Sequence, residues 1–290
     1  MITMQSRQRT ISSNPMCDVI GTLAQQALIA EVTLTPKPGL VDARNTGAHT
    51  DLTVDLMVRS AICLGPYFSQ MAAAAEQQPV SVWLREKIGA LGRDAEVAMM
   101  AETGGVNTHR GAIWALGLLS TAARVSSSKP RTAEQLCALA GEIASLEDRH
   151  VPTTFSKGKR ASNHYQVNGA KQQAQLGFPA ITDHALPTLR LSRLLGHSET
   201  EARLNALLAL TAHLTDTCVL SRAGLAGQHL LQSRSRAILS AGGVSTREGY
   251  AMLEQLDHEM IALNASPGGA ADLLAATLFV DWVEHSELSK

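Results

Sequence analysis

Residues 31–51 interrupt an otherwise helical pattern, and they read EVTLTPKPGLVDARNTGAHTD. Pro36, Pro38 and Gly39 are unsuited to a helix interior, so this stretch forms a loop between two helices. It concentrates acids, cations and an imidazole that a solvated linker does not need: Glu31, Lys37, Asp42, Arg44, Asn45, His49 and Asp51. The stretch predicts an ordered functional loop, and the alternative is an elaborate helix connection without a function.

Apolar residues recur at three- and four-residue steps on both sides of this loop. The pattern before the loop predicts a helix from an N-cap at Asp18 to Val32. Capping boxes at Thr132 and Ser198 predict two further helix starts, the second helix running to about Ser221. A separate helix is expected to begin at Gly224. No convincing alternation of period two occurs, so the sequence predicts an all-α fold.

The domain organisation follows from the same pattern. We expect a flexible N-terminal tail, residues 1–16, followed by one all-helical domain, residues 17–286. This single-domain multi-helix bundle has about nine to eleven helices, with functional loops at helix ends. Residues 150–184 show weak periodicity and are predicted to be irregular with one short helix. A long irregular insert in a compact domain is usually functional.

Three further polar stretches lie at predicted helix ends. Residues 103–111 read TGGVNTHRG, residues 215–222 read TDTCVLSR and residues 264–272 read NASPGGAAD. Asp216 is expected near the end of an apolar helix, where an unpaired carboxylate is costly to bury. Its predicted partner is Arg222 or a metal ion, and a structural Asp–Arg pair is the alternative without a function.

Composition excludes several classes of partner. Lys and Arg number 25 against 26 Asp and Glu, giving a net charge of -1, which provides no footprint for nucleic acid or an anionic membrane. The first fifteen residues lack the apolar run of a signal peptide, and no segment has the apolar length of a membrane span. Four widely spaced cysteines, Cys17, Cys63, Cys137 and Cys218, are predicted to be free thiols. The expected location is the cytoplasm.

The common nucleotide-binding motifs are absent. Neither the phosphate loop G-x-x-x-x-G-K-[ST] nor G-x-G-x-x-G after a strand occurs. If a nucleotide binds, helix N-termini, scattered cations and a divalent ion on carboxylates must hold its phosphates. The glycines Gly104 and Gly105, with Asn107, lead into a helix N-terminus that carries Arg110 in its first turn. This feature alone is a weak signal.

Taken together, the motifs resemble one known family. The order runs T-P-K-P-G-L-V-D-x-x-N-x-G-A-H-x-D from Thr35, T-G-G-V-N-T-H-R-G from Thr103, G-F-P from Gly177, D-T-x-x-x-x-R from Asp216, and N-x-S-P-G-G-x-A-D-L-L from Asn264. It is similar to the CitG/MdcB family of triphosphoribosyl-dephospho-coenzyme A synthases. The resemblance covers nearly the whole chain, from about residue 18 to about residue 282.

The resemblance implies an all-helical enzyme, a pentosyltransferase. It would transfer the 5-triphosphoribosyl group of ATP to the 2'-hydroxyl of 3'-dephospho-CoA and release adenine. The product is the precursor of the acyl carrier protein prosthetic group of malonate decarboxylase or citrate lyase. Residues 156–170 favour the malonate decarboxylase branch. Departures from the family pattern are Lys171 for Arg, Gln173 for Glu and Ala223 for Gly.

Breaking the N-glycosidic bond of ATP needs a base for the acceptor, a donor for the leaving group and a carboxylate near the sugar. The product's implied α linkage fits one inverting displacement. The catalytic candidates are Asp42 or Asp51 as base and His49 or His109 near adenine or a phosphate. The candidate ligands of Mg²⁺ are Glu31 and Asp216. The candidate ligands of the ATP phosphates are Lys37, Gly104, Gly105, Asn107, Arg110 and Arg222.

Other functions compete with this one. A metal-dependent nucleotide or ADP-ribosyl hydrolase would also place acids at helix ends, with water replacing 3'-dephospho-CoA as the acceptor. A helical carrier-protein adaptor would not explain the reactive side chains of the loops. Expected partners of the synthase are ATP, 3'-dephospho-CoA and a downstream holo-acyl carrier protein transferase, and a homodimer is a further expectation.

Overall fold

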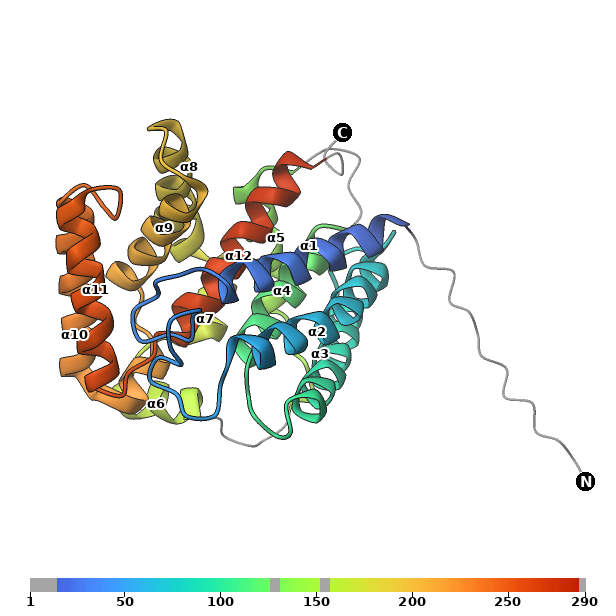
Figure 1. Ribbon diagram of the computed structural model, residues 1–290. Coiled ribbons are helices and arrows are strands. Elements are labelled where there is room, and N and C mark those ends of the chain that lie inside the picture. The colour runs from blue at the N-terminus through green and yellow to red at the C-terminus, as the bar shows by residue number, and fades with distance from the viewer. Residues whose placement is uncertain (1–14, 126–130, 152–156, 287–290) are drawn as a thin grey trace, which may run out of the picture.

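The computed structural model describes residues 15–125, 131–151 and 157–286, and every regular element within these ranges is helical (Figure 1). The described elements are α1 (Pro15–Val32), α2 (Val54–Ala75), α3 (Val82–Glu102), α4 (Arg110–Ala122), α5 (Ala133–Ser145), α6 (Lys157–Tyr165), α7 (Ala170–Gln175), the π-helix η1 (Ala180–Ala185), α8 (Leu186–Leu194), α9 (Glu199–His213), α10 (Thr217–Ser240), α11 (Arg247–Ala262) and α12 (Gly268–His285). The all-α prediction is confirmed.

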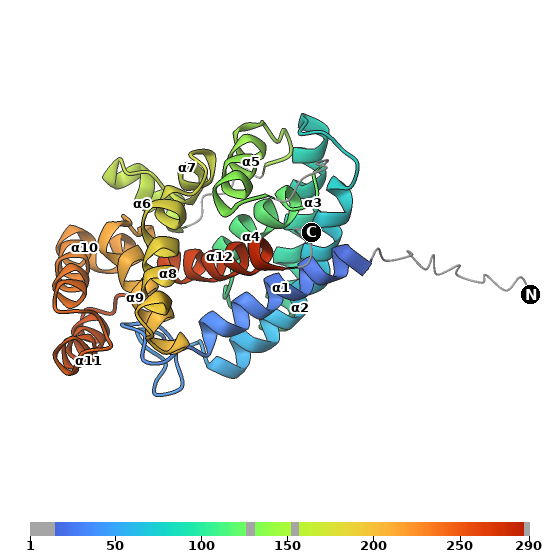
Figure 2. The same cartoon turned by 90° about the horizontal axis from the view of Figure 1, so that it is seen from above.

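Helix α12 runs through the middle of the molecule (Figure 2). It packs against α1, α4 and α9. Its sequence is apolar around most of the circumference, and a helix of that kind is stable only when neighbours cover it on all sides. Leu274, Leu278 and Phe279 are accordingly fully buried. Helix α12 is therefore the central, buried helix of the fold.

The segment from α1 to α2, residues 33–53, is an ordered loop as predicted. It lies against α11, because Asp257 of that helix accepts hydrogen bonds from the Gly39 backbone N–H (2.9 Å) and from the Arg44 guanidinium (2.9 Å). Gly39 has a φ of 67°, and a Cβ there would lie 2.3 Å from the carbonyl oxygen of Ala265. Glycine is therefore required at this close approach.

Several predicted boundaries are wrong. The helix predicted from Ser198 to Ser221 ends at His213, and Asp216 begins a new one by accepting the Cys218 N–H as N-cap. The break predicted before Gly224 is present as a kink in α10, where Gly224 has φ 63° and ψ -164°. The capping boxes at Thr132 and Ser198 are confirmed.

The N-terminal boundary also differs from the prediction. Helix α1 begins at Pro15 rather than at a cap on Asp18, and proline suits the first turn of a helix because its missing N–H has no partner to lose. Pro15 and Met16 thus belong to α1, and residues 1–14 of the predicted tail lie outside the described residues.

Residues 157–185 contain more helix than the sequence predicted. Helices α6, α7 and η1 lie there, where only one short helix was expected. Each is at most nine residues long, so it shows little periodicity, and α6 and α7 pack against α10 and α5 respectively. Short helices depend on such tertiary contacts. The extra short helices raise the number of described helices above the predicted count.

The predictions about cysteines and about membrane spans can also be compared with the structure. The four cysteines carry no disulfide, as predicted. Among the described residues no single helix is long and apolar enough to span a membrane. Helices α9 and α10 reach that length and composition only as a pair, and the chain bends by 65° between them.

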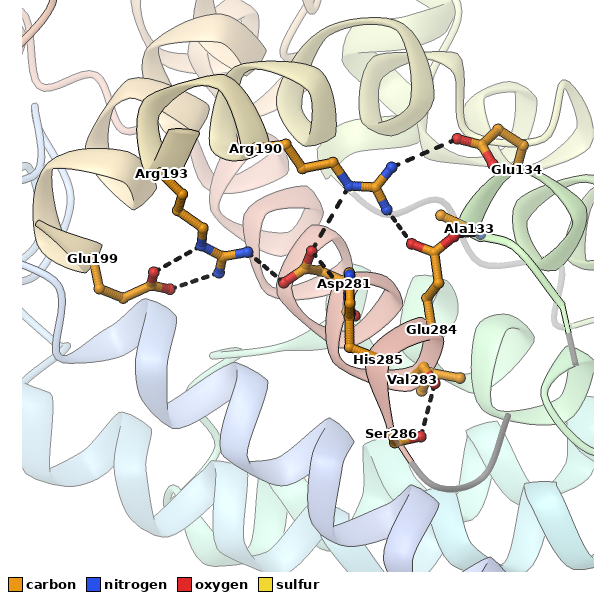
Figure 3. A network of polar contacts seen from close by, with 10 residues as sticks. All are labelled: Ala133, Glu134, Arg190, Arg193, Glu199, Asp281, Val283, Glu284, His285 and Ser286. Carbon is orange, nitrogen blue, oxygen red and sulfur yellow. Dashed lines mark hydrogen bonds and ion pairs between the residues drawn. The ribbon is translucent and has the colours of Figure 1, made fainter. Parts of the chain in front are cut away.

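A network of ion pairs connects α8 to the end of α12 (Figure 3). The Arg193 guanidinium donates to Asp281 (2.7 Å) and to Glu199, and both contacts raise the pKa of Arg193. Arg190 pairs with Glu284, which also accepts the Ala133 N–H at the start of α5 (3.1 Å). These contacts hold α5, α8 and α9 at the C-terminal end of α12.

We predict that Asp281→Asn lowers the free energy of unfolding by about 1.5–3 kcal/mol, because a nearly buried, charge-assisted hydrogen bond to Arg193 is lost. Urea denaturation followed by circular dichroism measures this change. The matched control is Glu86→Gln, which breaks the exposed pair with Arg149 and should cost less than about 1 kcal/mol. Equal losses in the two variants would contradict a stabilising role for this network.

Candidate active site

The loop 33–53 uses several of its reactive side chains to hold itself in place. Lys37 is only 1% exposed, and its ammonium donates to the Glu31 carboxylate (2.6 Å) and to the Glu31 backbone carbonyl (2.7 Å). The lysine thus satisfies the carboxyl end of α1 as well as neutralising a buried acid. Lys37 and Glu31, predicted as phosphate and metal ligands, are in the structure each other's partner.

Asp42 is buried in the same loop. Its carboxylate accepts the backbone N–H groups of Lys37 (2.9 Å), Arg44 (2.7 Å) and Asn45 (3.2 Å). This is the arrangement of an acid that fixes a turn. Asp51 behaves differently, because its side chain is 61% exposed and lies 3.6 Å from Nδ1 of His49.

His49 and Arg222, far apart in sequence, are brought together. Arg222 contacts Nδ1 of His49 (3.3 Å), and it donates to the Ala48 carbonyl (2.8 Å) and to the Asn264 side chain (3.1 Å). Burial and the neighbouring guanidinium lower the pKa of His49, which keeps the imidazole neutral near pH 7. Arg222 therefore joins loop 33–53 to the turn that precedes α12. Of the two predicted partners of Asp216, Arg222 or a metal ion, Arg222 has other contacts instead.

His109 lies inside the protein. Its Nδ1 shares a hydrogen bond with Ser60 (2.9 Å), whose hydroxyl also contacts Thr108 (2.6 Å). Burial, and then the charge of Lys37, lower the pKa of His109 to about 3, so the ring is neutral at physiological pH. Its Nε2 has no hydrogen-bond partner within the described part of the chain. A neutral, enclosed imidazole cannot pair with a phosphate by charge.

The glycine-rich turn before α4 is open to solvent. Gly104 and Gly105 have positive φ values of 63° and 93°, and a Cβ at either position would meet no atom within 4 Å. Asn107 accepts the Arg110 N–H (3.2 Å), and the Arg110 side chain pairs with Glu96 of α3 (2.9 Å). These residues thus lie together at the start of α4, as predicted.

A cavity of about 470 Å³, part of it open to solvent, lies where the first turns of α4, α7, α10 and α12 meet. Its wall includes Asp216, Asp272, Trp114 and Gln173. Of the predicted site residues, only Asp216 lines this cavity. Asp272 had no predicted role, although it lies in the first turns of a glycine-bearing helix start and within a family motif. Those two signals could have identified it.

Asp216 connects two of these helix starts. Its carboxylate accepts the Cys218 N–H of α10 (2.8 Å) and the Ala270 N–H of α12 (3.0 Å). Two backbone partners compensate the buried charge, although desolvation still raises the pKa of Asp216. The acid thus accepts one backbone N–H from the start of each helix. A helix N-terminus with free N–H groups would otherwise attract an anion.

Asp272 is the most perturbed acid of the cavity. Burial, the charge of Glu31 and the charge of Asp216 together raise the pKa of Asp272 well above 3.8, and a hydrogen bond from the Ala112 backbone opposes them. Gly111 and Gly269 make room for the two acids. A Cβ on Gly111 would lie 2.0 Å from Asp272 Oδ2, and one on Gly269 would lie 3.1 Å from Asp216 Oδ2.

Because the pKa of Asp272 is raised, we predict that the native chain and Asp272→Asn differ in stability by an amount that depends on pH. Folding favours the protonated form of Asp272, so its contribution to stability is lost as the pH rises through the folded-state pKa. Asp272→Asn removes this cost. The variant should melt at a higher temperature than the native chain at about pH 8, and the difference should shrink as the pH falls toward 3.8.

Thermal melts in buffer without divalent cations measure this difference across the pH range. The matched control is Asp55→Asn, which changes an exposed acid of α2 whose partner is Arg59. A melting temperature for Asp272→Asn that is lower than native at every pH would contradict the prediction.

Comparison with known proteins identifies the family. A family model described as ATP:dephospho-CoA triphosphoribosyl transferase, CitG, matches residues 17–290. The protein is therefore an enzyme, and its class is that of the transferases. The chain belongs to the CitG family. The family inferred from the motifs is thus confirmed, while the choice of branch stays a prediction.

Similar relatives carry the corresponding name. The 2-(5''-triphosphoribosyl)-3'-dephosphocoenzyme-A synthase of Klebsiella pneumoniae is 52% identical over 260 residues, 90% of this chain and 92% of the relative. The probable synthase of Pseudomonas fluorescens strain Pf0-1 is 51% identical over 271 residues, 93% of each chain. That of Azotobacter vinelandii is 50% identical over 277 residues, 95% of this chain and 94% of the relative. No solved structure matches this chain.

Proposed function

We propose that this chain transfers the 5-triphosphoribosyl group of ATP to the 2'-hydroxyl of 3'-dephospho-CoA and releases adenine. Relatives that bear this name support the proposal, because they are similar along nearly their whole length. The structural observation that carries it is the pair of carboxylates, Asp216 and Asp272, on one cavity wall beside the indole of Trp114.

The carboxylate pair suits the chemistry of the transfer. The bond between the ribose C1' and the adenine nitrogen breaks, and a bond from C1' to the acceptor oxygen forms. Positive charge develops on the sugar, and the leaving adenine carries away the bonding electrons. Carboxylates in a partly desolvated cavity stabilise such a cation. The acceptor hydroxyl must also lose its proton, which requires a base.

We assign the base role to Asp272. Burial and the charges of Glu31 and Asp216 raise the pKa of Asp272 well above that of an ordinary aspartate, and a carboxylate with a raised pKa is a stronger base. Asp42 is a weaker candidate, since its carboxylate holds three backbone N–H groups. Asp51 is also a weaker candidate, because its side chain is 61% exposed and it does not line the cavity.

We also propose that a Mg²⁺ ion arrives in this cavity with ATP. Magnesium is usually held by one or two carboxylates together with substrate phosphates and water. Asp216 faces the cavity and makes no ion pair with a Lys or Arg in the described ranges, whereas Glu31 is already neutralised by Lys37. We therefore propose Asp216 as the protein ligand. The ion would reduce the repulsion between the phosphate charges and the acids.

The proposal is tested by mixing the purified protein with ATP, Mg²⁺ and 3'-dephospho-CoA. Free adenine, measured by chromatography, and an adduct with the mass of the triphosphoribosyl product are expected. Each should require both substrates. Adenine release that is indifferent to 3'-dephospho-CoA would instead support a nucleotide hydrolase, in which water replaces the acceptor.

We predict that Asp272→Asn lowers kcat by about 10²–10⁴-fold, because the base is lost, while the affinity for ATP changes little. Steady-state kinetics and calorimetry measure the two quantities. Asp42→Asn is the matched control, expected to lower the melting temperature and to leave the kcat of the folded enzyme nearly unchanged. The reverse pattern would place the base in loop 33–53.

We further propose that the product serves malonate decarboxylase rather than citrate lyase, on the resemblance of residues 156–170 to that branch. The holo-acyl carrier protein transferase that consumes the product would then be the downstream partner. Of the branch residues, 157–170 belong to α6 and the segment that leads into the cavity wall at Gly169 and Ala170.

The departures at Lys171 and Gln173 should be tolerated. Gln173 lines the cavity, and its side chain accepts the Ala180 N–H (3.4 Å), so it has a structural contact of its own. Restoring Arg and Glu, by Lys171→Arg and Gln173→Glu, should change kcat by less than about tenfold, or roughly 1.4 kcal/mol of barrier. A much larger gain in Gln173→Glu would show that two carboxylates are too few for full activity.

A further inference from the structure

A second cavity of about 630 Å³, part of it open to solvent, lies between α3 and α4. Its wall combines apolar side chains with Arg85, Arg93 and Asp148. Trp114 lines both this cavity and the acidic one, so the two spaces share one side chain as a wall. The second cavity, between α3 and α4, is called the arginine cavity.

Arg85 is buried without enough partners. The residue is 6% exposed, and its Nη1 lies 3.5 Å from Asp148 Oδ2, a long contact for a hydrogen bond. Its Nε–H has no acceptor in the described part of the chain. A guanidinium carries five N–H donors, and burying one without acceptors is costly. Desolvation accordingly lowers the pKa of Arg85.

The second arginine competes for the same carboxylate. Arg93 donates to Asp148 Oδ2 (2.9 Å), whose other oxygen accepts the His150 N–H (2.9 Å). Two guanidiniums therefore share one negative charge. The remaining acid of the wall, Glu96, is paired with Arg110 (2.9 Å). These groups leave the arginine cavity with an excess of positive charge.

The acidic cavity has the opposite character. Its wall includes two aspartates and no Lys or Arg from the described ranges, and Asp216 already occupies amides of two helix N-termini. A chain of phosphates would be repelled there unless a metal ion accompanied it. Both proposed substrates carry such a chain, so a separate place for it is needed.

We infer that the arginine cavity is a binding subsite for a phosphate chain, with Arg85 and Arg93 as its cationic ligands. Arginine suits this ligand, because its planar fork donates two hydrogen bonds to one phosphate. The centroid of the Trp114 ring, which lines both cavities, lies 5.1 Å from the guanidinium carbon of Arg85. That the phosphates belong to a substrate rests on the proposed function; the anion site itself does not.

A larger side chain at Gly92 can fill part of the arginine cavity. A Cβ added to Gly92 would lie 3.8 Å from Met71 and 4.0 Å from Ile113, so alanine fits there without strain. A leucine at Gly92 would place further carbon atoms in the same space. Gly92→Leu therefore blocks the cavity without changing its charge, and Arg93→Gln changes the charge without blocking it.

The test uses calorimetric titration with inorganic tripolyphosphate, which needs no catalysis. The native chain should bind the probe, and Arg93→Gln and Gly92→Leu should each weaken binding by about tenfold or more. Gly92→Ala should weaken it less than Gly92→Leu. The control Arg149→Gln removes an exposed arginine outside the cavity and should bind as the native chain does.

Melting temperatures show that each variant is folded. Binding of tripolyphosphate that is equal in the native chain, Arg93→Gln and Gly92→Leu would overturn the inference, and so would a loss of the same size in Arg149→Gln.

Titrations with ATP and with 3'-dephospho-CoA then identify the source of the phosphates. The substrate whose affinity falls in both Arg93→Gln and Gly92→Leu is the one that occupies the subsite. If neither affinity changes while tripolyphosphate binding is lost, the assignment to a substrate is wrong. A failure of the synthase reaction itself would appear separately, as absent adenine release by the native chain.

Discussion

The structure of the candidate site depends on one buried carboxylate, that of Asp216. Its two oxygens accept a backbone N–H at the start of α10 and another at the start of α12, so one charge fixes the relative position of two helices. The partial positive charge of each helix N-terminus makes this burial tolerable. Because α12 is the central helix, the position of its first turn also determines where Asp272 lies. The acidic cavity is therefore a consequence of how two helix starts are joined.

Loop 33–53 supports this arrangement from behind. Lys37 forms a buried ion pair with Glu31 of α1, whose carboxylate is one of the causes that raise the pKa of Asp272. Asp257 and Arg222 fasten the loop to α11 and to the turn before α12. The polar residues of the loop that look reactive in the sequence thus mainly hold the loop and its neighbours in place. The loop contributes in that sense through Lys37, which holds the carboxylate of Glu31 at the end of α1.

The two cavities divide the charges that a transfer between two phosphorylated substrates has to accommodate. Two aspartates line one, where a sugar cation would develop, and the wall of the other carries Arg85 and Arg93, which share the carboxylate of Asp148. Trp114 stands between them, with its indole N–H donating to the Ala170 carbonyl (3.3 Å) and its ring beside Arg85. Because the two arginines share one carboxylate, part of their positive charge remains available to an anionic ligand.

The sequence by itself determined the all-α class, the helix starts at Thr132 and Ser198, and the family, because these features depend on periodicity, caps and motifs that act within a few residues. Only the tertiary structure decided which charges are free. Lys37 has the charge of a phosphate ligand but is paired with Glu31 in the fold, and the position of Asp272 beside Asp216 in the cavity is what makes it a candidate. Arg85 and Asp148, 63 residues apart, form a pair that no local pattern indicates. The physical reason is that desolvation and Coulomb interactions depend on distance in space, whereas the helical signals in a sequence extend over only a few turns.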